Sequence, residues 1–358
     1  MAETWNNTRM ICKHMLRRRH TGFPVIQVLG IGLTLGALCG FTGCGGGGGA
    51  STDSAAAPSP PVAAPLPPTT PAITGRGFPS AAPWASCYGS AAQMGDLNKA
   101  AQTFRIINID ADPGVGGFTP AQITQLKAGG QNRVISYLNV GAAESFRTYW
   151  TQVPAGFVSG KDNAAAHLGA YAGYPDETWM NLGNADYQHL IVDYVAARLV
   201  AQGIDGLFLD NLELVEHGPT DVNGPCDAGC RQGGLDLVRK LREKYPTLLL
   251  VMQNATGDVT RLGTTGGIPF PSLLDGISHE EVYTPQKDRQ SEQELRAWQG
   301  LRLTPGGRPF WIGTEDYVGD CANTGAAQAA YIASRGQGFS PYATDDSAKQ
   351  ETLCYWEF

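Results

Sequence analysis

The sequence lacks the patterns that usually hold a metal ion or a nucleotide. It has six His in 358 residues, and Cys226 and Cys230 have no second Cys pair or His pair at ligand spacing. The Asp-x-Asp-x-Asp-Gly spacing of a calcium loop is absent. No Gly-rich phosphate turn follows an early apolar run, which disfavours a doubly wound dinucleotide-binding sheet. We therefore expect no metal and no cofactor.

Basic side chains are also scarce. The 26 Lys and Arg are outnumbered by 33 Asp and Glu. Residues 1–43 hold five basic side chains and one acidic one, so the remainder carries 21 basic and 32 acidic side chains and a net charge of −11. Such a balance disfavours nucleic acid as a partner.

Long apolar runs are confined to the N-terminal region. The basic stretch 15–20 precedes a mostly apolar run, 23–39, and small residues precede Cys44. This layout is typical of a bacterial secretory signal and resembles a lipoprotein signal, with Cys44 as the lipidated residue. A plain signal peptide or a single membrane anchor is the alternative. We expect an exported protein of the bacterial envelope, or a secreted one, whose membrane contact is the lipid at Cys44.

The chain divides into three parts. Residues 1–43 form the predicted signal segment, and 44–83 are rich in Gly, Ala, Ser and Pro, which predicts a disordered tether. Residues 84–358 have the size of one TIM barrel, and we expect a monomer. Beyond Cys44, we expect a local disulfide between Cys226 and Cys230, and a second among Cys87, Cys321 and Cys354 that leaves one thiol free.

Apolar runs and helical patterns alternate along the third part. Helical spacing recurs in 119–129, 186–202, 233–245, 291–301 and 326–335, and Thr119-Pro120 is typical of a helix start. Eight strands alternating with helices predict a (β/α)8 TIM barrel. The eight expected strands are Trp84–Tyr88, Phe104–Asp110, Arg133–Val140, Gly206–Asp210, Leu248–Asn254, Asp275–Glu280, Pro309–Glu315 and Gly338–Ala343.

Nearly every expected strand ends in polar residues. In a TIM barrel the carboxyl ends of all strands lie on the face that binds substrate. One Asp or Asn there can simply cap a turn or a helix, but acids on several strand ends indicate a cavity. Glu213 and Glu216 we expect to face solvent. The strand-end groups are Asp110, Asp112, Asn139, Glu144, Asp210, Asn211, Gln253, Asn254, His279, Glu280, Glu281, Glu315, Asp316, Asp345 and Asp346.

Several of these segments resemble glycoside hydrolase family 114, the endo-α-1,4-polygalactosaminidase-like proteins. The resemblance implies a TIM-barrel hydrolase of α-1,4-linked galactosamine polymers, with Asp210 and Glu280 as its paired carboxylates and Asp110 and Glu144 in the same pocket. The matching stretches are IINID, VISYLNVGAAESFRTYW, GIDGLFLDNLE, MQN, LDGISHEEVY and WIGTEDY.

Glycoside hydrolysis commonly needs one carboxylic acid and one carboxylate that flank the scissile bond. We expect Asp210 to be the nucleophile or base and Glu280 the general acid. Polar residues at the same face would contact the sugar, and aromatic side chains near the rim would stack on its rings. The expected substrate-binding residues are Asp110, Tyr137, Glu144, Arg147, Asn211, Asn254, Tyr283 and Glu315, and the candidate stacking residues are Trp150, Trp179, Tyr283 and Tyr317.

An acid-lined mouth favours a polysaccharide that carries free amines, because carboxylates attract a cationic polymer and repel an acidic uronan. Neutral glycans stay possible as substrates.

Three other functions also stay open: a non-catalytic glycan-binding surface lipoprotein on the same barrel, a metal-dependent hydrolase with carboxylate ligands, and a surface interaction protein in which the acids only solvate the rim.

Overall fold

The computed structural model describes residues 77–79, 82–301, 310–347 and 349–358. The predicted signal segment, Cys44 and nearly all of the predicted tether lie outside these residues. Within the described part of the chain, no helix combines the length and the apolar character needed to cross a membrane.

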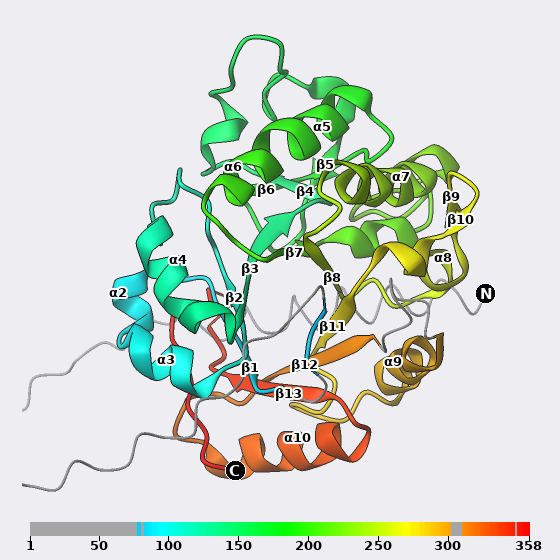
Figure 1. Cartoon of the computed structure of the whole chain (residues 1–358). Helices are drawn as coiled ribbons and strands as arrows, with labels where there is room; N and C mark the ends of the chain where they lie inside the picture. Colours follow the sequence, from blue (N-terminus) through cyan, green and yellow to red (C-terminus); the bar gives the residue numbers. More distant parts are fainter. Residues whose placement is uncertain (1–76, 80–81, 302–309, 348) are drawn as a thin grey trace, which may run out of the picture.

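The eight expected strands all form, and they make one parallel sheet in the order β1-β2-β3-β7-β8-β11-β12-β13. Figure 1 shows them side by side with helices around them. The barrel is nearly closed, and Trp84 of β1 links its two end strands, because its indole Nε1 donates a 2.8 Å hydrogen bond to the carbonyl of Ser340 in β13. The strands are β1 (Trp84–Cys87), β2 (Ile106–Ile109), β3 (Arg133–Asn139), β7 (Gly206–Asp210), β8 (Leu249–Gln253), β11 (Gly276–Glu280), β12 (Trp311–Tyr317) and β13 (Ser340–Thr344).

Aromatic rings fill part of the barrel interior. Trp84 is fully buried, and its ring centroid lies 5.2 Å from that of Trp311, 5.9 Å from that of Tyr342 and 6.4 Å from that of Phe208. Gly313 leaves the room that Trp311 needs, because a Cβ at this position would lie 2.5 Å from the indole ring. The interior is therefore a packed core, and the polar groups lie at the strand ends.

Helices form in all five segments with the predicted spacing. Thr119 is the N-cap of α4: its hydroxyl accepts from the amide of Gln122, and the Gln122 side chain accepts from the amide of Thr119, which is a capping box with Pro120 as the first helical residue. The helices are α4 (Pro120–Leu126), α5 (Ala185–His189), η4 (Leu190–Val195), α6 (Ala196–Ala201), α7 (Ala228–Lys244), α9 (Arg289–Leu301) and α10 (Thr324–Gly336).

The sequence did not predict the smaller elements. A three-stranded antiparallel sheet, in the order β4-β6-β5, is inserted between β3 and β7, and Figure 1 shows it with α5 and α6 beside those strands. The remaining elements are α2 (Ala91–Met94), α3 (Leu97–Thr103), η1 (Ala128–Gly130), β4 (Ala142–Glu144), η2 (Thr148–Trp150), η3 (Ala164–Ala166), β5 (His167–Ala170), β6 (Glu177–Met180), η5 (Leu212–Glu216), α8 (Asp258–Leu262), β9 (Thr264–Thr265), β10 (Ile268–Pro269) and η6 (Phe270–Leu273).

The cysteine predictions are confirmed. Cys226 and Cys230 form a disulfide at the start of α7, and Cys321 pairs with Cys354. Cys87 is the free, buried thiol among the described cysteines. Two disulfides are typical of a protein that folds in an oxidising compartment.

Candidate active site

Asp210 and Glu280 stand at the same end of the barrel. Asp210 is the last residue of β7 and Glu280 the last of β11, with β8 between these strands. Two strand spacings put the two backbones about 10 Å apart, so carboxyl groups that lean inward can approach one another. Burial raises the pKa of Asp210 to about 7, and the negative charge of Glu280 is the second cause of this rise. The two groups therefore lie close enough to interact electrostatically.

The chain turns sharply directly after these strands. Asn211, Asn254 and Glu281 each follow the last residue of a barrel strand and have φ angles of 59°, 60° and 55°, a left-handed conformation that is uncommon for residues other than Gly. The turn at Asn211 requires Gly141, because a Cβ there would lie 1.8 Å from the Asn211 carbonyl oxygen. The turns present the strand-end side chains to the barrel mouth.

Glu280 is held by neighbours on both of its oxygens. Asn254 Nδ2 donates to Oε2 at 2.9 Å, and the Asn254 side-chain oxygen accepts from the Glu280 amide at 3.0 Å. The Tyr317 hydroxyl donates to Oε1 and itself accepts from Nε2 of Gln350 at 2.8 Å. Glu280 is thus oriented by a chain of hydrogen bonds that begins at Gln350, which is 3% exposed.

Arg147 lies in an ion-pair network with acids at one side of the mouth. Its Nε donates to Glu144 at 2.8 Å, and its Nη1 donates to both oxygens of Asp110 at 3.0 and 2.9 Å. The Tyr137 hydroxyl also donates to Glu144, at 3.3 Å. Burial raises the pKa of Glu144, although Arg147 opposes the shift. This network fixes the wall that carries Asp110, Tyr137, Glu144 and Arg147.

Glu315 contributes a buried carboxyl beside Glu280. The two residues are partners in the register of β11 and β12. Glu315 is fully buried, and neither of its carboxyl oxygens has a hydrogen-bond partner among the described residues. Burial is the largest cause that raises its pKa well above the ordinary value, and the charges of Glu280 and Asp210 raise it further. The folded protein therefore disfavours the ionised form of this carboxyl.

Tyr283 lies apart from this group. Its amide donates to Asp316 at 2.6 Å, and the ammonium of Lys287 lies 5.8 Å from its ring centroid.

Among the predicted stacking residues, Trp179 is 1% exposed and stacks on Tyr171 with ring centroids 4.0 Å apart. Trp179 therefore packs in the core, and its predicted role as an exposed sugar platform is wrong.

Two glutamates at the mouth escaped the sequence prediction. Glu213 is 7% exposed, so the expectation that it faces solvent is wrong. Burial raises its pKa well above the ordinary value, and Asp210, Glu280 and Glu177 add to the shift. Glu177, in β6, has its pKa raised to about 8 by burial, then by Glu144 and Asp210. Glu216 is also not a solvent-facing residue, because it accepts from the amides of Val259 and Thr260.

Tyr88 was also missed. Its hydroxyl accepts from Nδ2 of Asn108 at 3.0 Å. Burial raises the pKa of this hydroxyl, and the charges of Glu315, Asp210 and Glu280 raise it further. The position of Tyr88 at the end of an expected strand was the sequence signal that could have identified it.

We call the carboxyls gathered at the mouth the acid cluster. Its members are Glu144, Glu177, Asp210, Glu213, Glu280 and Glu315.

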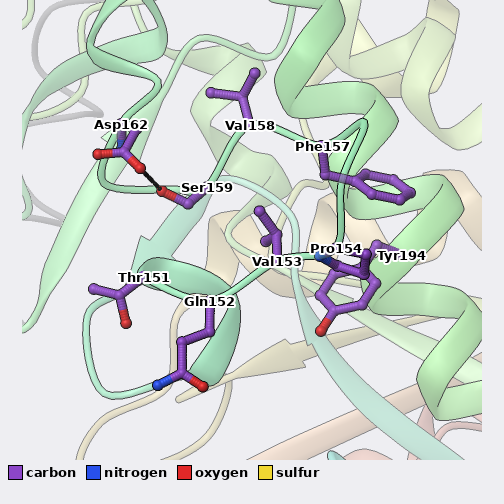
Figure 2. A pocket seen from close by; sticks show the side chains of 9 residues that line it. All are labelled: Thr151, Gln152, Val153, Pro154, Phe157, Val158, Ser159, Asp162 and Tyr194. Atoms are coloured by element: carbon purple, nitrogen blue, oxygen red, sulfur yellow. Dashed lines mark hydrogen bonds between the residues drawn. The ribbon is translucent and has the colours of Figure 1, made fainter.

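A separate pocket of about 690 Å³ lies in the inserted region. Figure 2 shows its lining, with Phe157 and Tyr194 at one side and the hydrogen bond from Ser159 to Asp162 at the other. Its lining contains no member of the acid cluster. Among all the described residues, the acid cluster included, no group of three or more His, Cys, Asp or Glu is arranged to hold a metal ion.

A parallel eight-stranded barrel with carboxyl pairs at the carboxyl ends of its strands is the arrangement of a glycoside hydrolase. Comparison with known proteins agrees. The model of glycoside-hydrolase family GH114 matches residues 68–244, which agrees with the predicted family. A glycoside hydrolase family implies a polysaccharide substrate.

Solved structures and one curated relative are similar over much of the chain. The glycoside hydrolase domain of PelA from Pseudomonas aeruginosa is 18% identical, with a TM-score of 0.56, over 76% of this chain and 96% of that domain. A variant of the same domain has a TM-score of 0.55 with the same identity and coverage. An uncharacterized protein of Deinococcus radiodurans is 26% identical over 254 residues, which are 66% of this chain and 72% of that protein. The structural likeness agrees with the barrel fold.

Proposed function

We propose that this protein hydrolyses an α-1,4-linked, galactosamine-containing polysaccharide with Asp210 and Glu280 as its catalytic pair. The observation that carries the proposal is the placement of these two carboxyls at the same end of the barrel, on β7 and β11 with β8 between them, where the charge of Glu280 helps to raise the pKa of Asp210. In a glycoside hydrolase, such a pair has the composition that cleavage of a glycosidic bond requires.

In the proposed reaction, Glu280 donates a proton to the glycosidic oxygen as the bond from that oxygen to the anomeric carbon breaks. Asp210, as the carboxylate, attacks the anomeric carbon or removes a proton from the attacking water. The elements of water are added across the cleaved bond, and the two carboxyls recover their protonation states. Tyr317 and Asn254 hold Glu280 in place during this transfer.

The proton of the pair must be on Glu280 for this assignment to work. With a pKa of about 7, Asp210 carries a proton about half of the time at neutral pH in the empty site. A cation bound next to Asp210 favours its ionised form, which is the form that the proposed nucleophile or base must have. A substrate with ammonium groups would therefore prepare Asp210 for reaction.

The charge of the mouth supports an amino-sugar substrate. The acid cluster combines with a net charge of −7 for the whole chain, and its field attracts a polymer of positively charged galactosamine units. The same field repels a polymer of uronic acids. The family resemblance and the electrostatics point to the same class of polysaccharide by independent arguments.

The test is hydrolysis of partially deacetylated α-1,4-galactosaminan by the full chain, followed as new reducing ends and as oligosaccharides in mass spectra. We expect Asp210→Asn and Glu280→Gln to lower kcat by about 10³-fold or more. Asp345→Asn is the matched control, because Asp345 follows β13 and its carboxylate accepts from the Ser347 amide. It should retain wild-type activity.

Three results would contradict the proposal. Full activity in both catalytic variants would remove the pair from the mechanism. Binding of the polymer without release of oligosaccharides by the wild type would favour the non-catalytic glycan-binding function instead. Loss of activity in chelator would favour the metal-dependent alternative.

We also propose export with lipidation at Cys44. The two disulfides support an oxidising compartment. Metabolic labelling with a tritiated fatty acid should mark the wild-type chain and not Cys44→Ser; equal labelling of both chains would exclude this anchor.

A further inference from the structure

Two carboxyls that take no part in the proposed proton transfers lie beside Asp210. Glu177 comes from the inserted sheet, and its Oε2 accepts from Nδ2 of Asn139 at 3.1 Å and from Nδ2 of Asn211 at 3.3 Å. Asn139 is the register partner of Asp210 across β3 and β7, and Asn211 is the next residue along the chain. The two amides therefore hold the Glu177 carboxyl over the end of β7.

Glu213 approaches the same place from η5. It is 7% exposed, and its Oε2 has no hydrogen-bond partner among the described residues. Its carboxyl interacts electrostatically with Asp210, Glu280 and Glu177. A buried polar atom without a partner is unfavourable, unless a ligand supplies the missing contact.

An aromatic side chain lies near these glutamates. Tyr171 is partly exposed, and it stacks on Trp179, whose Nε1 donates to Asn223 at 2.7 Å and is thereby fixed. The pKa of Tyr171 is raised by burial, then by the charge of Glu213, so its hydroxyl and that carboxyl interact electrostatically. An aromatic face and two carboxyls together form surroundings that suit a cation on a sugar ring.

We propose that Glu177 and Glu213 bind the ammonium group of the amino-sugar residue whose glycosidic bond is cleaved. The inference rests on the proposed function. In a 2-amino sugar the nitrogen is attached to the carbon next to the anomeric carbon. If Asp210 acts at the anomeric carbon, the groups beside Asp210 are the ones that reach this nitrogen.

The site distinguishes a free amine from an acetylated one. An ammonium donates hydrogen bonds and provides the positive charge that two neighbouring carboxylates require. An N-acetyl group is neutral and bulkier, and it offers one N–H donor. The site therefore selects the deacetylated sugar at the position of cleavage. It does not discriminate against acetylated residues elsewhere along the polymer.

Binding should also release protons. The pKa of Glu177 is raised to about 8 in the empty site, so near pH 7 this carboxyl is largely protonated. An ammonium stabilises the ionised form, and the displaced proton enters the buffer. The number of protons released is a signature that a purely structural role of Glu177 and Glu213 would not produce.

The experiment compares Glu177→Gln and Glu213→Gln with the wild type on two sets of oligosaccharides of equal length, one fully deacetylated and one partly acetylated. We expect the ratio of kcat/KM for deacetylated over acetylated substrate to fall at least tenfold in each variant. Asp176→Asn is the matched control, since it removes one charge from an exposed neighbour of Glu177. Its ratio should equal that of the wild type.

Calorimetry of a deacetylated galactosamine oligosaccharide with the full chain, in buffers of different ionisation enthalpy, supplies a readout independent of turnover. The wild type should release protons on binding, and the double variant should release fewer and bind more weakly. Unchanged ratios and unchanged proton release would overturn the inference, as would an equal change in Asp176→Asn. Failure of the proposed function is a distinct result, namely no hydrolysis by the wild type or full activity in Asp210→Asn.

Discussion

Replacing Asp210 by Asn should stabilise the protein while it removes the activity. The pKa of this buried carboxyl lies above its ordinary value, so the folded state favours the protonated form more than the unfolded state does. As pH rises from about 4 to about 7, the unfolded chain loses this proton first, and the free energy of unfolding falls. Below about pH 4 the carboxyl is protonated in both states and this contribution vanishes.

The size of the effect follows from the shift. A rise from 3.8 to about 7, at about 1.4 kcal/mol for each pKa unit, corresponds to about 4 kcal/mol of lost stability above pH 7. Asn has a similar shape and no charge, so the variant escapes this cost. At pH 8 its free energy of unfolding should exceed that of the wild type by as much as about 4 kcal/mol, and its Tm by roughly 10 °C.

Urea unfolding at pH 4, 6 and 8 measures the difference directly, with Asp176→Asn as a control for the loss of one exposed charge. The gap between Asp210→Asn and the wild type should widen steadily with pH. A gap that is the same at all three pH values, or that closes as pH rises, would refute the reasoning. It would mean that Asp210 is ionised in the folded state without cost.

Three further predictions concern the same site and its supports. The acid limb of kcat/KM should have an apparent pKa near 7, because Asp210 must ionise before it reacts; a limb near pH 4 would contradict this. Gln350→Ala should lower kcat about five- to tenfold with little change in KM, because Glu280 loses its oriented Tyr317 donor; an unchanged kcat with a raised KM would contradict this. Breaking the Cys321–Cys354 disulfide, which closes a separation of 33 residues, with Ser at both positions should cost about 3–4 kcal/mol in urea unfolding, and an unchanged midpoint would argue against it.

The barrel could be predicted because its strands are continuous apolar runs. Leu207, Phe208 and Leu209 are fully buried, as expected for a parallel strand covered on both faces, and the switch to Asp210 marks the strand end. The inserted sheet has no comparable signal. In β5 (His167–Ala170) the residues are partly or fully exposed, so neither an apolar run nor an alternation identifies it.

The members of the acid cluster also differ in whether the sequence could predict them. Asp210, Glu280 and Glu315 follow from strand ends alone. Glu177 belongs to a short strand of the inserted sheet, and the contacts that hold it come from Asn139 and Asn211, more than thirty residues away in either direction. No local pattern reveals such a contact.

Glu213 was misjudged for a different reason. It lies three residues beyond a strand end, where a loop usually faces solvent. The left-handed turn at Asn211 and the short η5 helix fold it back into the mouth instead. The sequence also could not show that Arg147 would be engaged by Asp110 and Glu144, since the pairing depends on how β2 and β3 are placed.

The small antiparallel sheet separates two tasks that many enzymes assign to the same residues. The proposed catalytic pair is carried by barrel strands β7 and β11, whereas Glu177, proposed to bind the sugar amine, is carried by β6 of the insertion. A change in the insertion could therefore alter which sugar is accepted while the bond-breaking groups keep their positions. Among related barrels, exchange of this one segment would be an economical route by which new polysaccharide preferences evolve, and it offers protein engineers a self-contained unit to transplant.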